Sequence, residues 1–328
     1  MNKLVANQQL WYAKCITIII GLTINHFSGH GCAPILKLMK GVADLHSHSR
    51  YSDGTLAVSE LVTLAKSRGV NLFALTDHDE MRGLEEAKHC AHEQGMAWVS
   101  GVEVSAQTNG TAVHVLGLRV DEHDAGLHDA LHKTREKRKH RAQRMSDSLA
   151  VAGISDALKG ALAYAPNPDL ISRTHFARHL VDSGVCGSFG EVFSRFLKPG
   201  KPGYTPHEWL PMTEAIALIH GAGGRAVLAH PGRYELDPFT GIEGLLRTFT
   251  DAGGDGVEVV CAAHHPSEWA QFGALARKYG LLASIGSDFH SHAESRVKFG
   301  DLPRLSPNLK PVWHDWPEAE CLYVKSNA

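Results

Sequence analysis

The chain has 328 residues, of which 43% are hydrophobic and 21% are charged, and its formal net charge is −2. This is ordinary globular composition, long enough for one large α/β domain or two smaller ones, and it excludes nucleic-acid binding through an overall basic surface. The unusual feature is a count of 22 histidines, because neutral imidazole is the commonest metal ligand in proteins.

Residues 1–38 differ from the rest of the chain. Their apolar stretch, residues 15–22, is too short to span a bilayer, and no small-residue cleavage site of a secretory signal follows it. We interpret residues 1–38 as an extension outside the fold.

The six cysteines form no CxxC pair, which is typical of reduced thiols in a cytoplasmic protein. Any metal ion must therefore bind to His, Asp or Glu.

From residue 42 onward, short apolar runs alternate with amphipathic stretches. The predicted strands are 42–46, 71–76, 98–104, 112–118, 225–229, 256–261 and 282–285. The predicted helices between them are 57–68, 82–94, 212–222, 241–252 and 266–279. Glycines typical of left-handed helix C-caps follow these helices, at Gly69, Gly95, Gly223, Gly253 and Gly280. Repeated βα units predict an α/β fold with a parallel sheet covered by helices, and seven strands favour a barrel.

The alternation stops between residues 121 and 206, where only helices are predicted, at 126–151, 174–183 and 188–197. We interpret 121–206 as a helical insertion that covers one rim of the barrel as a substrate lid. It separates a first barrel part, 39–120, from a second, 207–305, and residues 306–328 form a C-terminal tail.

Seven Lys and Arg side chains lie in the stretch from Lys133 to Arg144. They form either a solvated helix face or a surface that steers an oligonucleotide.

Residues with metal-binding side chains lie at or near the ends of the predicted strands. His46 and His48 are two residues apart, so both rings point to one face of an extended segment, and Asp53 follows in the next loop. Six more candidates occur at later strands: His78, Glu103, His114, His230, Asp288 and His290. Barrel enzymes place their chemistry at the carboxyl rim of the strands. Asp77 and Asp79 flank His78 and are candidates to orient imidazoles by hydrogen bonds.

Nine nitrogen and oxygen donors exceed the needs of one ion, and they suit Mn, Zn or Fe. We therefore expect a cluster of two or three divalent ions with Glu103 as a bridging ligand. Such clusters generate hydroxide near neutral pH and hold the attacking and leaving oxygens of a phosphoryl centre. The alternative for the same ligands is a structural or storage role.

The motifs HxHxxxSDG, TDHD, GVE, AHP and GSDFH, in this order over residues 41–300, resemble those of the polymerase and histidinol phosphatase (PHP) superfamily. The resemblance implies a distorted seven-stranded (β/α) barrel with a trinuclear site, often of Mn, Zn or Fe. By this likeness His46, His48, Glu103 and Asp288 hold one ion and the catalytic hydroxide. Glu103, His114 and His230 hold a second ion, and Asp53, His78 and His290 a third. Some relatives have His in place of Asp53.

The segments SDGTL, ALTDHD and ISRTHFA (residues 171–177) are similar to one branch of that superfamily. It contains 3′,5′-nucleoside bisphosphate phosphatases and ribonuclease AM, a 5′→3′ exoribonuclease of short RNAs. The likeness implies hydrolysis of nucleotide phosphate esters, with Ser172 and Arg173 as phosphate ligands. For His175 we expect phosphate contact, the alternatives being assistance to the leaving group or a place at the solvent-exposed surface. Manganese is the metal we expect. Arginine is a natural bidentate partner for phosphate, although Arg173 could also be a surface or capping residue.

Two other functions fit the sequence. Histidinol-phosphate phosphatase shares the barrel and its ligands, and a metal-binding module that senses nucleotides without hydrolysing them would use the same site. The insertion with Ser172 and Arg173 favours the nucleotide phosphoesterase. We expect a cytoplasmic enzyme acting on a small nucleotide or short RNA, with no membrane and no obligate protein partner.

Overall fold

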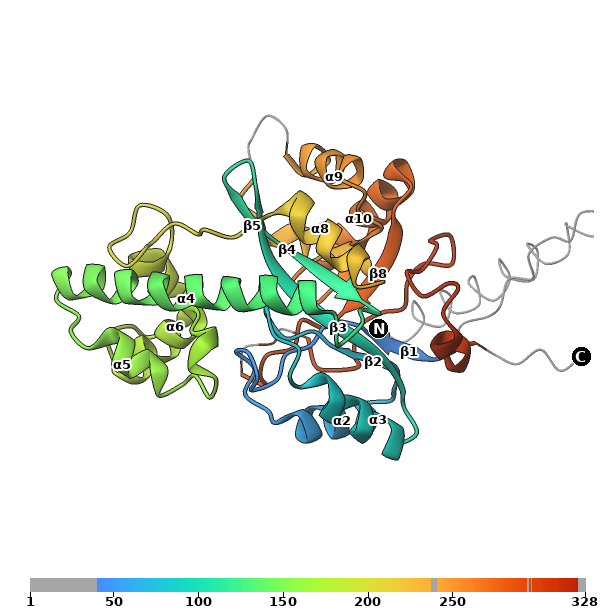
Figure 1. Cartoon of the computed structure of the whole chain (residues 1–328), viewed down its shortest axis with the longest axis horizontal. Coiled ribbons are helices and arrows are strands. Elements are labelled where there is room, and N and C mark those ends of the chain that lie inside the picture. The colour runs from blue at the N-terminus through green and yellow to red at the C-terminus, as the bar shows by residue number, and fades with distance from the viewer. Residues whose placement is uncertain (1–39, 237–240, 294, 296, 324–328) are drawn as a thin grey trace, which may run out of the picture. The chain divides into compact units, whose positions relative to one another are not determined.

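The structure is a computed structural model that describes residues 40–236, 241–293, 295 and 297–323, so the expected extension at 1–38 lies outside the described residues. One mixed sheet has the strand order β1-β2-β3-β4-β6-β7-β8 (Figure 1). These strands are β1 (Val42–Asp44), β2 (Val70–Leu75), β3 (Ala97–Thr108), β4 (Thr111–Leu118), β6 (Arg225–Leu228), β7 (Gly256–Cys261) and β8 (Leu282–Gly286). All seven predicted strands are confirmed.

The first and last strands of this path meet, so the sheet is a nearly closed barrel. The Leu45 amide donates to the Ile285 carbonyl at 3.0 Å. Just beyond the strands, the His48 amide donates to the Phe289 carbonyl at 2.9 Å, and the Asp288 amide donates to the His46 carbonyl at 2.8 Å. Closure thus brings the segment after β1 beside the segment after β8, and both segments contain predicted ligands.

The expectation of an all-parallel sheet is wrong at β4, which runs antiparallel to both β3 and β6. Only Asn109 and Gly110 separate β3 from β4, and their φ angles are +48° and +78°. A two-residue Asn-Gly loop with both φ values positive is the type I′ turn preferred by hairpins. A two-residue strand that was not predicted, β5 (Leu210–Pro211), pairs with β3.

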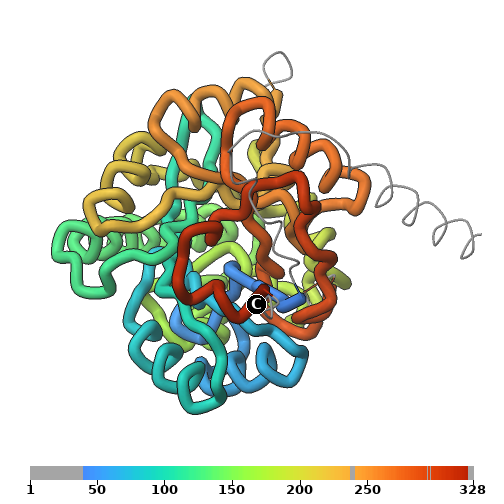
Figure 2. Tube along the Cα trace, turned by 90° about the vertical axis from the view of Figure 1, so that its right-hand side faces the viewer, coloured from blue at the N-terminus to red at the C-terminus, as the bar shows by residue number. Residues whose placement is uncertain are grey.

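Helices ring the strands of the barrel (Figure 2). They are α2 (Val58–Ser67), α3 (Leu84–Glu93), α8 (Met212–Gly221), α9 (Gly241–Asp251) and α10 (Pro266–Tyr279), close to the predicted bounds. In α2 the buried residues Val58, Leu61, Val62 and Ala65 follow helical spacing, so that one apolar face packs on the sheet. All five predicted glycine caps have positive φ.

Between β4 and β5 the chain is helical. Its elements are α4 (Ala125–Val151), α5 (Ala157–Leu162), η1 (Pro168–Leu170), α6 (Arg173–Asp182), α7 (Phe189–Val192) and the π-helical turn η2 (Phe193–Leu197). We call residues 125–197 the inserted helices. They have a core of their own, which includes Met145, Leu149, Phe176, Leu180 and Val192. The short elements α5 and η1 were not predicted. Figure 1 shows α4 extending from the strands to the rest of this segment.

The described part of the predicted C-terminal tail is packed on the barrel. Trp313, Trp316 and Leu322 are buried, and the Leu322 carbonyl accepts hydrogen bonds from the Lys40 and Gly41 amides at 2.8 and 3.0 Å. Residues 306–323 therefore contribute to the barrel core. Over the described residues, no helix combines the length and apolarity that a membrane crossing requires.

Candidate metal centre

The two histidines of the first motif lie just after β1, in a segment that stays extended because Ser47 pairs with Phe289 in parallel register. Alternation along this segment places the His46 and His48 rings on one side, with their centroids 5.1 Å apart. Gly54 closes the loop that follows. A Cβ at this position would lie 2.3 Å from the His48 carbonyl oxygen, so only glycine fits.

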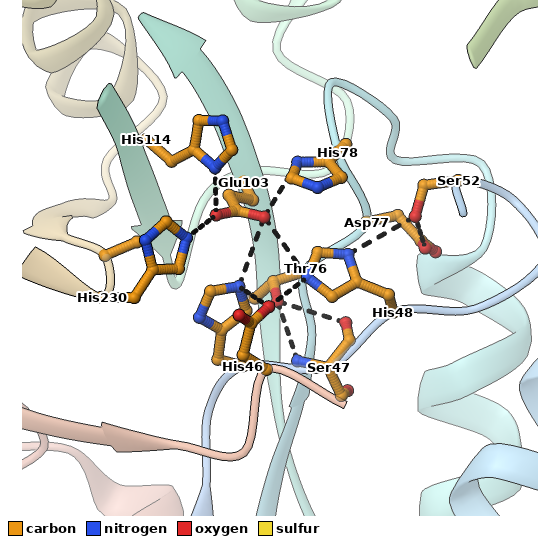
Figure 3. A network of polar contacts seen from close by, with 12 residues as sticks. His46, Ser47, His48, Ser52, Thr76, Asp77, His78, Glu103, His114 and His230 are labelled. Carbon is orange, nitrogen blue, oxygen red and sulfur yellow. Dashed lines mark hydrogen bonds and ion pairs between the residues drawn. The ribbon is translucent and has the colours of Figure 1, made fainter. Parts of the chain in front are cut away.

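Glu103 is the centre of the site, and the carboxylate is fully buried (Figure 3). Its Oε1 lies 2.8 Å from both His114 Nδ1 and His230 Nε2. Its Oε2 lies 2.9 Å from His78 Nδ1 and 3.3 Å from the Nε2 atoms of His46 and His48. Five imidazoles therefore face one carboxylate, which is the arrangement expected around a bridging ligand.

Two of the predicted ligands do not lie at the C-terminal ends of their strands. Glu103 lies in the middle of β3, which continues to Thr108. His114 lies near the start of β4, opposite Ser105 of β3. Because β4 runs antiparallel, its beginning reaches the same rim as the carboxyl ends of the other strands. The hairpin thus supplies ligands to the rim from both of its strands.

The remaining predicted ligands, Asp288, Asp53 and His290, also contact this centre. Asp288 Oδ1 lies 3.4 Å from His46 Nε2 and 3.2 Å from His48 Nε2. Asp53 Oδ1 lies 3.2 Å from His290 Nε2 and 3.8 Å from His78 Nε2. All nine predicted residues are thereby brought together. Three sets have donor atoms close enough to share an ion: His46, His48, Glu103 and Asp288; His48, Asp53, His78 and His290; and His78, Glu103 and His114.

Several of these donor atoms are buried and have no hydrogen-bond partner among the described residues. They are His46 Nε2, His48 Nε2, His78 Nδ1, Asp53 Oδ1, Glu103 Oε2 and Asp288 Oδ1. Buried polar atoms are normally paired, and leaving a carboxylate oxygen unpaired in the interior is costly. A divalent cation satisfies nitrogen and carboxylate donors together, so the residues present fit such ions.

Electrostatics support the same conclusion. Burial lowers the pKa of His48 to about 3 and that of His114 to about 4, so both imidazoles are neutral at physiological pH, as metal ligands must be. At His290 burial also lowers the pKa, but the neighbouring Asp53 carboxylate outweighs it and raises the value to about 9. The carboxylates thus attract positive charge into the cluster.

The backbone is strained at three positions of this rim. Asp79, His230 and Asp288 have φ values of +47°, +27° and +50°, a region that residues other than glycine rarely adopt. Such strain concentrates at functional sites and persists where surrounding contacts hold it.

Sequence reasoning missed Glu258 on β7. It is fully buried, lies 3.0 Å from His46 Nδ1 through Oε1, and accepts a hydrogen bond from the His230 amide through Oε2 at 2.6 Å. It therefore orients the His46 ring and the backbone of His230, both of which are predicted ligands. The signal was present, because Glu258 is the one charged residue in the otherwise apolar strand Gly256–Cys261.

Sequence reasoning also missed Arg233. Its Nη1 lies 2.6 Å from Asp288 Oδ2, and about half of its side chain is exposed. It lines a cavity of about 290 Å³ together with Asp288 and His290 of the barrel and Phe189 and Phe193 of the inserted helices. The cavity therefore opens beside the ligand cluster, with a guanidinium group at its wall.

The expected role of the two aspartates around His78 needs correction. Asp77 Oδ1 accepts hydrogen bonds from the Ser49 amide at 2.7 Å and from Ser52 Oγ at 2.5 Å. It reaches an imidazole only through Ser52, whose Oγ lies 3.5 Å from His48 Nδ1. Asp79 forms a buried ion pair with Arg138 and accepts from the Ser105 amide, so it fixes the rim backbone and binds no imidazole.

The three residues predicted to bind phosphate lie at the start of α6. Ser172 Oγ donates to Asp53 Oδ2 at 3.2 Å. His175 is buried, and its Nδ1 accepts from the Ser172 amide at 3.0 Å. The Arg173 guanidinium lies 5.7 Å from the Phe193 ring centroid and has no hydrogen bond or ion pair to any described residue. Of the three side chains, only Arg173 forms no hydrogen bond or ion pair to a described residue, although the buried His175 Nε2 also has no hydrogen-bond partner in the described part of the chain.

The Lys and Arg side chains between residues 133 and 144 of α4 point partly inward and partly to the surface. Arg135, Arg138 and Arg141 bond to Asp79 or Thr205 and point inward. At the surface, Lys133, Lys139 and Arg144 form ion pairs with Asp129, Glu136 and Glu208. The run is therefore neither wholly a solvated face nor a free basic stripe.

Comparisons with known proteins agree with this site. Residues 44–192 match the PHP domain family model. The chain is 44% identical over 272 residues to a 3′,5′-nucleoside bisphosphate phosphatase of Chromobacterium violaceum, covering 83% of this chain and 95% of that protein. It is 37% identical over 281 residues to a 5′–3′ exoribonuclease of Escherichia coli, covering 85% and 95%.

A solved structure from Bifidobacterium adolescentis, described as a metal-dependent phosphoesterase, is 28% identical and superimposes with a TM-score of 0.70, covering 87% of this chain and 98% of that one. The similarity to these proteins covers more than four fifths of this chain and nearly the whole length of each of them. The chain therefore belongs to the PHP domain family.

Proposed function

We propose that this chain is a divalent-metal-dependent phosphoesterase that hydrolyses nucleotide phosphate esters. Its substrates would be the 3′-phosphate of a 3′,5′-nucleoside bisphosphate, the 5′-terminal nucleotide of a short 5′-phosphorylated RNA, or both. One observation carries the proposal: the nine candidate ligand residues converge on the rim, and several of their buried donor atoms have no hydrogen-bond partner among the described residues.

In this proposal His46, His48, Glu103 and Asp288 hold one ion. Glu103, His114 and His230 hold a second, and Asp53, His78 and His290 hold a third. Manganese is our first choice, with zinc and iron as alternatives. Ions in such a site activate water for attack on phosphorus and neutralise charge on the phosphoryl oxygens. Glu258 and the backbone pairing between the segments after β1 and β8 keep the ligands in place.

Arginines beside the cluster would bind the phosphate. Arg233 already contacts one oxygen of Asp288, and its exposed face lines the cavity. Arg173 comes from the inserted helices. Burial, followed by the repulsion of Arg233 and Arg138, lowers the pKa of Arg173. Such uncompensated positive charge attracts an anion, and the planar guanidinium pairs with phosphate in bidentate fashion.

Further unpartnered groups lie around Arg173. Arg141 is buried, and its Nη2 and the His207 Nδ1 have no hydrogen-bond partner in the described structure. Burial first, and then the neighbouring Arg173, lowers the pKa of Arg141 to about 9. We therefore assign phosphate binding mainly to Arg173. Ser172 and His175 would support it from the start of α6. Ser172 Oγ and His175 Nδ1 already bond within the chain, whereas the buried His175 Nε2 has no hydrogen-bond partner among the described residues.

The relatives' names favour nucleotide or RNA substrates over histidinol phosphate. A sensing module without hydrolysis is disfavoured because all nine candidate ligand positions are filled, eight of them lie in groups that could share an ion, and His230 contacts Glu103 at 2.8 Å. One site can act on both leaving groups, so we propose both a small nucleotide and a short RNA as substrates.

The test is product release with Mn²⁺ from three substrates in parallel: adenosine 3′,5′-bisphosphate, a 5′-phosphorylated RNA oligomer and histidinol phosphate. Asp288→Ala serves as the inactive control. We expect turnover of the bisphosphate or the RNA and none by the control. Turnover of histidinol phosphate alone would contradict the nucleotide assignment. No turnover of any of the three substrates by a chain that binds metal would support the sensing module.

A further inference from the structure

Among their contacts with the barrel, the inserted helices form hydrogen bonds to two loops that carry proposed metal ligands. The first is the loop of Asp53. Ser172 Oγ donates to Asp53 Oδ2 at 3.2 Å, and Arg178 Nη2 donates to the Asp53 carbonyl at 2.8 Å. In the same loop, Asn167 Nδ2 donates to the Tyr51 carbonyl at 2.9 Å. Side chain and backbone of Asp53 are thus both held from α6.

The two carboxylate oxygens of Asp53 have different neighbours, and this difference suggests how the ligand is oriented. Oδ2 accepts from Ser172, whereas Oδ1 is buried, has no hydrogen-bond partner among the described residues, and faces His290 Nε2 at 3.2 Å. The hydrogen bond from Ser172 fixes the rotation of the carboxylate, and this rotation aims Oδ1 at the histidines. Partners of this kind orient metal ligands and tune their affinity.

The second loop is that of His78. Arg138 Nε and Nη2 donate to Asp79 Oδ2 at 2.8 and 2.6 Å, and Arg135 Nη1 donates to the Asp79 carbonyl at 2.6 Å. Asp79 is the residue after His78, and its φ is +47°. Two arginines of α4 therefore hold the strained backbone that follows the His78 ligand.

The other ligands are held within the barrel. Glu258 of β7 fixes the His46 ring and the His230 amide, and the Asp288 amide donates to the His46 carbonyl. The contacts from the inserted helices thus reach Asp53 itself and Asp79, the residue after His78, and Asp53 and His78 belong to one proposed ligand group. Arg138 Nη2 also donates to Ser105 Oγ of β3 at 2.7 Å.

We propose that the inserted helices set the metal affinity of the group Asp53, His78 and His290, with Ser172 and Arg178 as positioning residues. This rests on the metal assignment in the proposed function. Coupling between two binding events is reciprocal. An ion in this group therefore tightens the docking of α6 on the barrel, and docked α6 tightens binding of that ion. Phosphate captured by Arg173, at the start of α6, would act through the same link.

The test is a Mn²⁺ titration of the chelator-stripped full chain by calorimetry, comparing wild type with Ser172→Ala, Ser172→Thr and Arg178→Met. Ser188→Ala is the matched control, because Ser188 caps α7 of the inserted helices by accepting from the Glu191 amide. We expect Ser172→Ala and Arg178→Met to weaken one class of ion by roughly 10- to 100-fold and to leave the other class unchanged. Ser172→Thr should restore wild-type affinity.

Hydrogen exchange of residues 173–182 supplies the second readout. We expect Mn²⁺ to slow exchange in wild type and Ser188→Ala, and to have a clearly smaller effect in Ser172→Ala. The proposal is overturned if Ser172→Ala and Ser188→Ala bind every ion as wild type does, or if Mn²⁺ leaves exchange of α6 unchanged in wild type. Neither readout requires hydrolysis. Failure of the substrate test is therefore distinguishable from failure of this coupling.

Discussion

Replacing Glu258 by Gln tests whether this buried carboxylate orients the ligand cluster. Both groups bonded to Glu258 are donors in the orientation that metal binding requires: the His46 Nδ1–H toward Oε1 at 3.0 Å, and the His230 amide toward Oε2 at 2.6 Å. A carboxylate accepts both bonds. A glutamine has one oxygen and one NH₂ group, so it can satisfy only one of the two donors.

Either orientation of the amide is unfavourable. With NH₂ toward His46, the ring must present Nδ1 as an acceptor and carry its proton on Nε2, the atom that faces Glu103 and Asp288. That tautomer cannot bind an ion through Nε2. With NH₂ toward His230, two donors oppose each other in the interior. A mispaired buried group costs about 1–3 kcal/mol, which corresponds to roughly 5- to 150-fold in affinity.

The assay is Mn²⁺ affinity by calorimetry together with kcat/KM for adenosine 3′,5′-bisphosphate. We expect both to fall by about 10- to 100-fold in Glu258→Gln. Glu243→Gln is the control, because Glu243 is a surface carboxylate of α9 that bonds to Lys278 and Tyr279. Metal affinity in Glu258→Gln equal to that of the control would refute the tautomer argument.

Three further predictions concern stability and packing. Arg138→Met leaves the buried Asp79 charge unpaired and should lower the free energy of unfolding in urea by about 3–5 kcal/mol. The double variant with Asp79→Asn should recover part of this loss, and an additive result would contradict the pairing. Burial lowers the pKa of His175 to about 4, below its unfolded value of about 6.5. Between these values the unfolded chain binds more protons, so stability falls as pH falls. Chelator-stripped wild type should lose about 1.5 kcal/mol more than His175→Gln between pH 6.5 and 5 in urea unfolding, and equal slopes would refute this. A Cβ at Gly286 would lie 2.2 Å from His46 Cβ. Gly286→Ala should therefore lower Mn²⁺ affinity in calorimetry at least tenfold, and unchanged affinity would contradict this close approach.

The sequence predicted the barrel strands and the nine clustered residues because both leave local signals. Apolar runs mark buried strands, and ligand residues two apart at strand ends mark a shared face. The antiparallel direction of β4 departs from the βα alternation of the other strands, which predicts parallel pairing, although Asn109-Gly110 is a strong hairpin signal. His114 reaches the rim only because of this reversal.

Contacts distant in sequence could not be predicted in the same way. Ser172 and Asp53 are 119 residues apart, and Arg138 and Asp79 are 59 apart. Only the packing of the inserted helices on the barrel brings these pairs together. The composition of α4 predicted a basic helix, but not which of its arginines face inward. Glu258 is a partly predictable residue. Its single charge in an otherwise apolar strand indicates a buried partner, but the sequence does not indicate which residue that partner is.

The central claim is that divalent ions held by this cluster enable hydrolysis of a nucleotide phosphate ester. Stepwise return of Mn²⁺ to the chelator-stripped chain, with phosphate release from adenosine 3′,5′-bisphosphate as the readout, tests it most directly. We predict no turnover without metal and a rise that requires at least two ions per chain. Turnover that persists after chelation, or that is complete with a single ion per chain, would contradict the account.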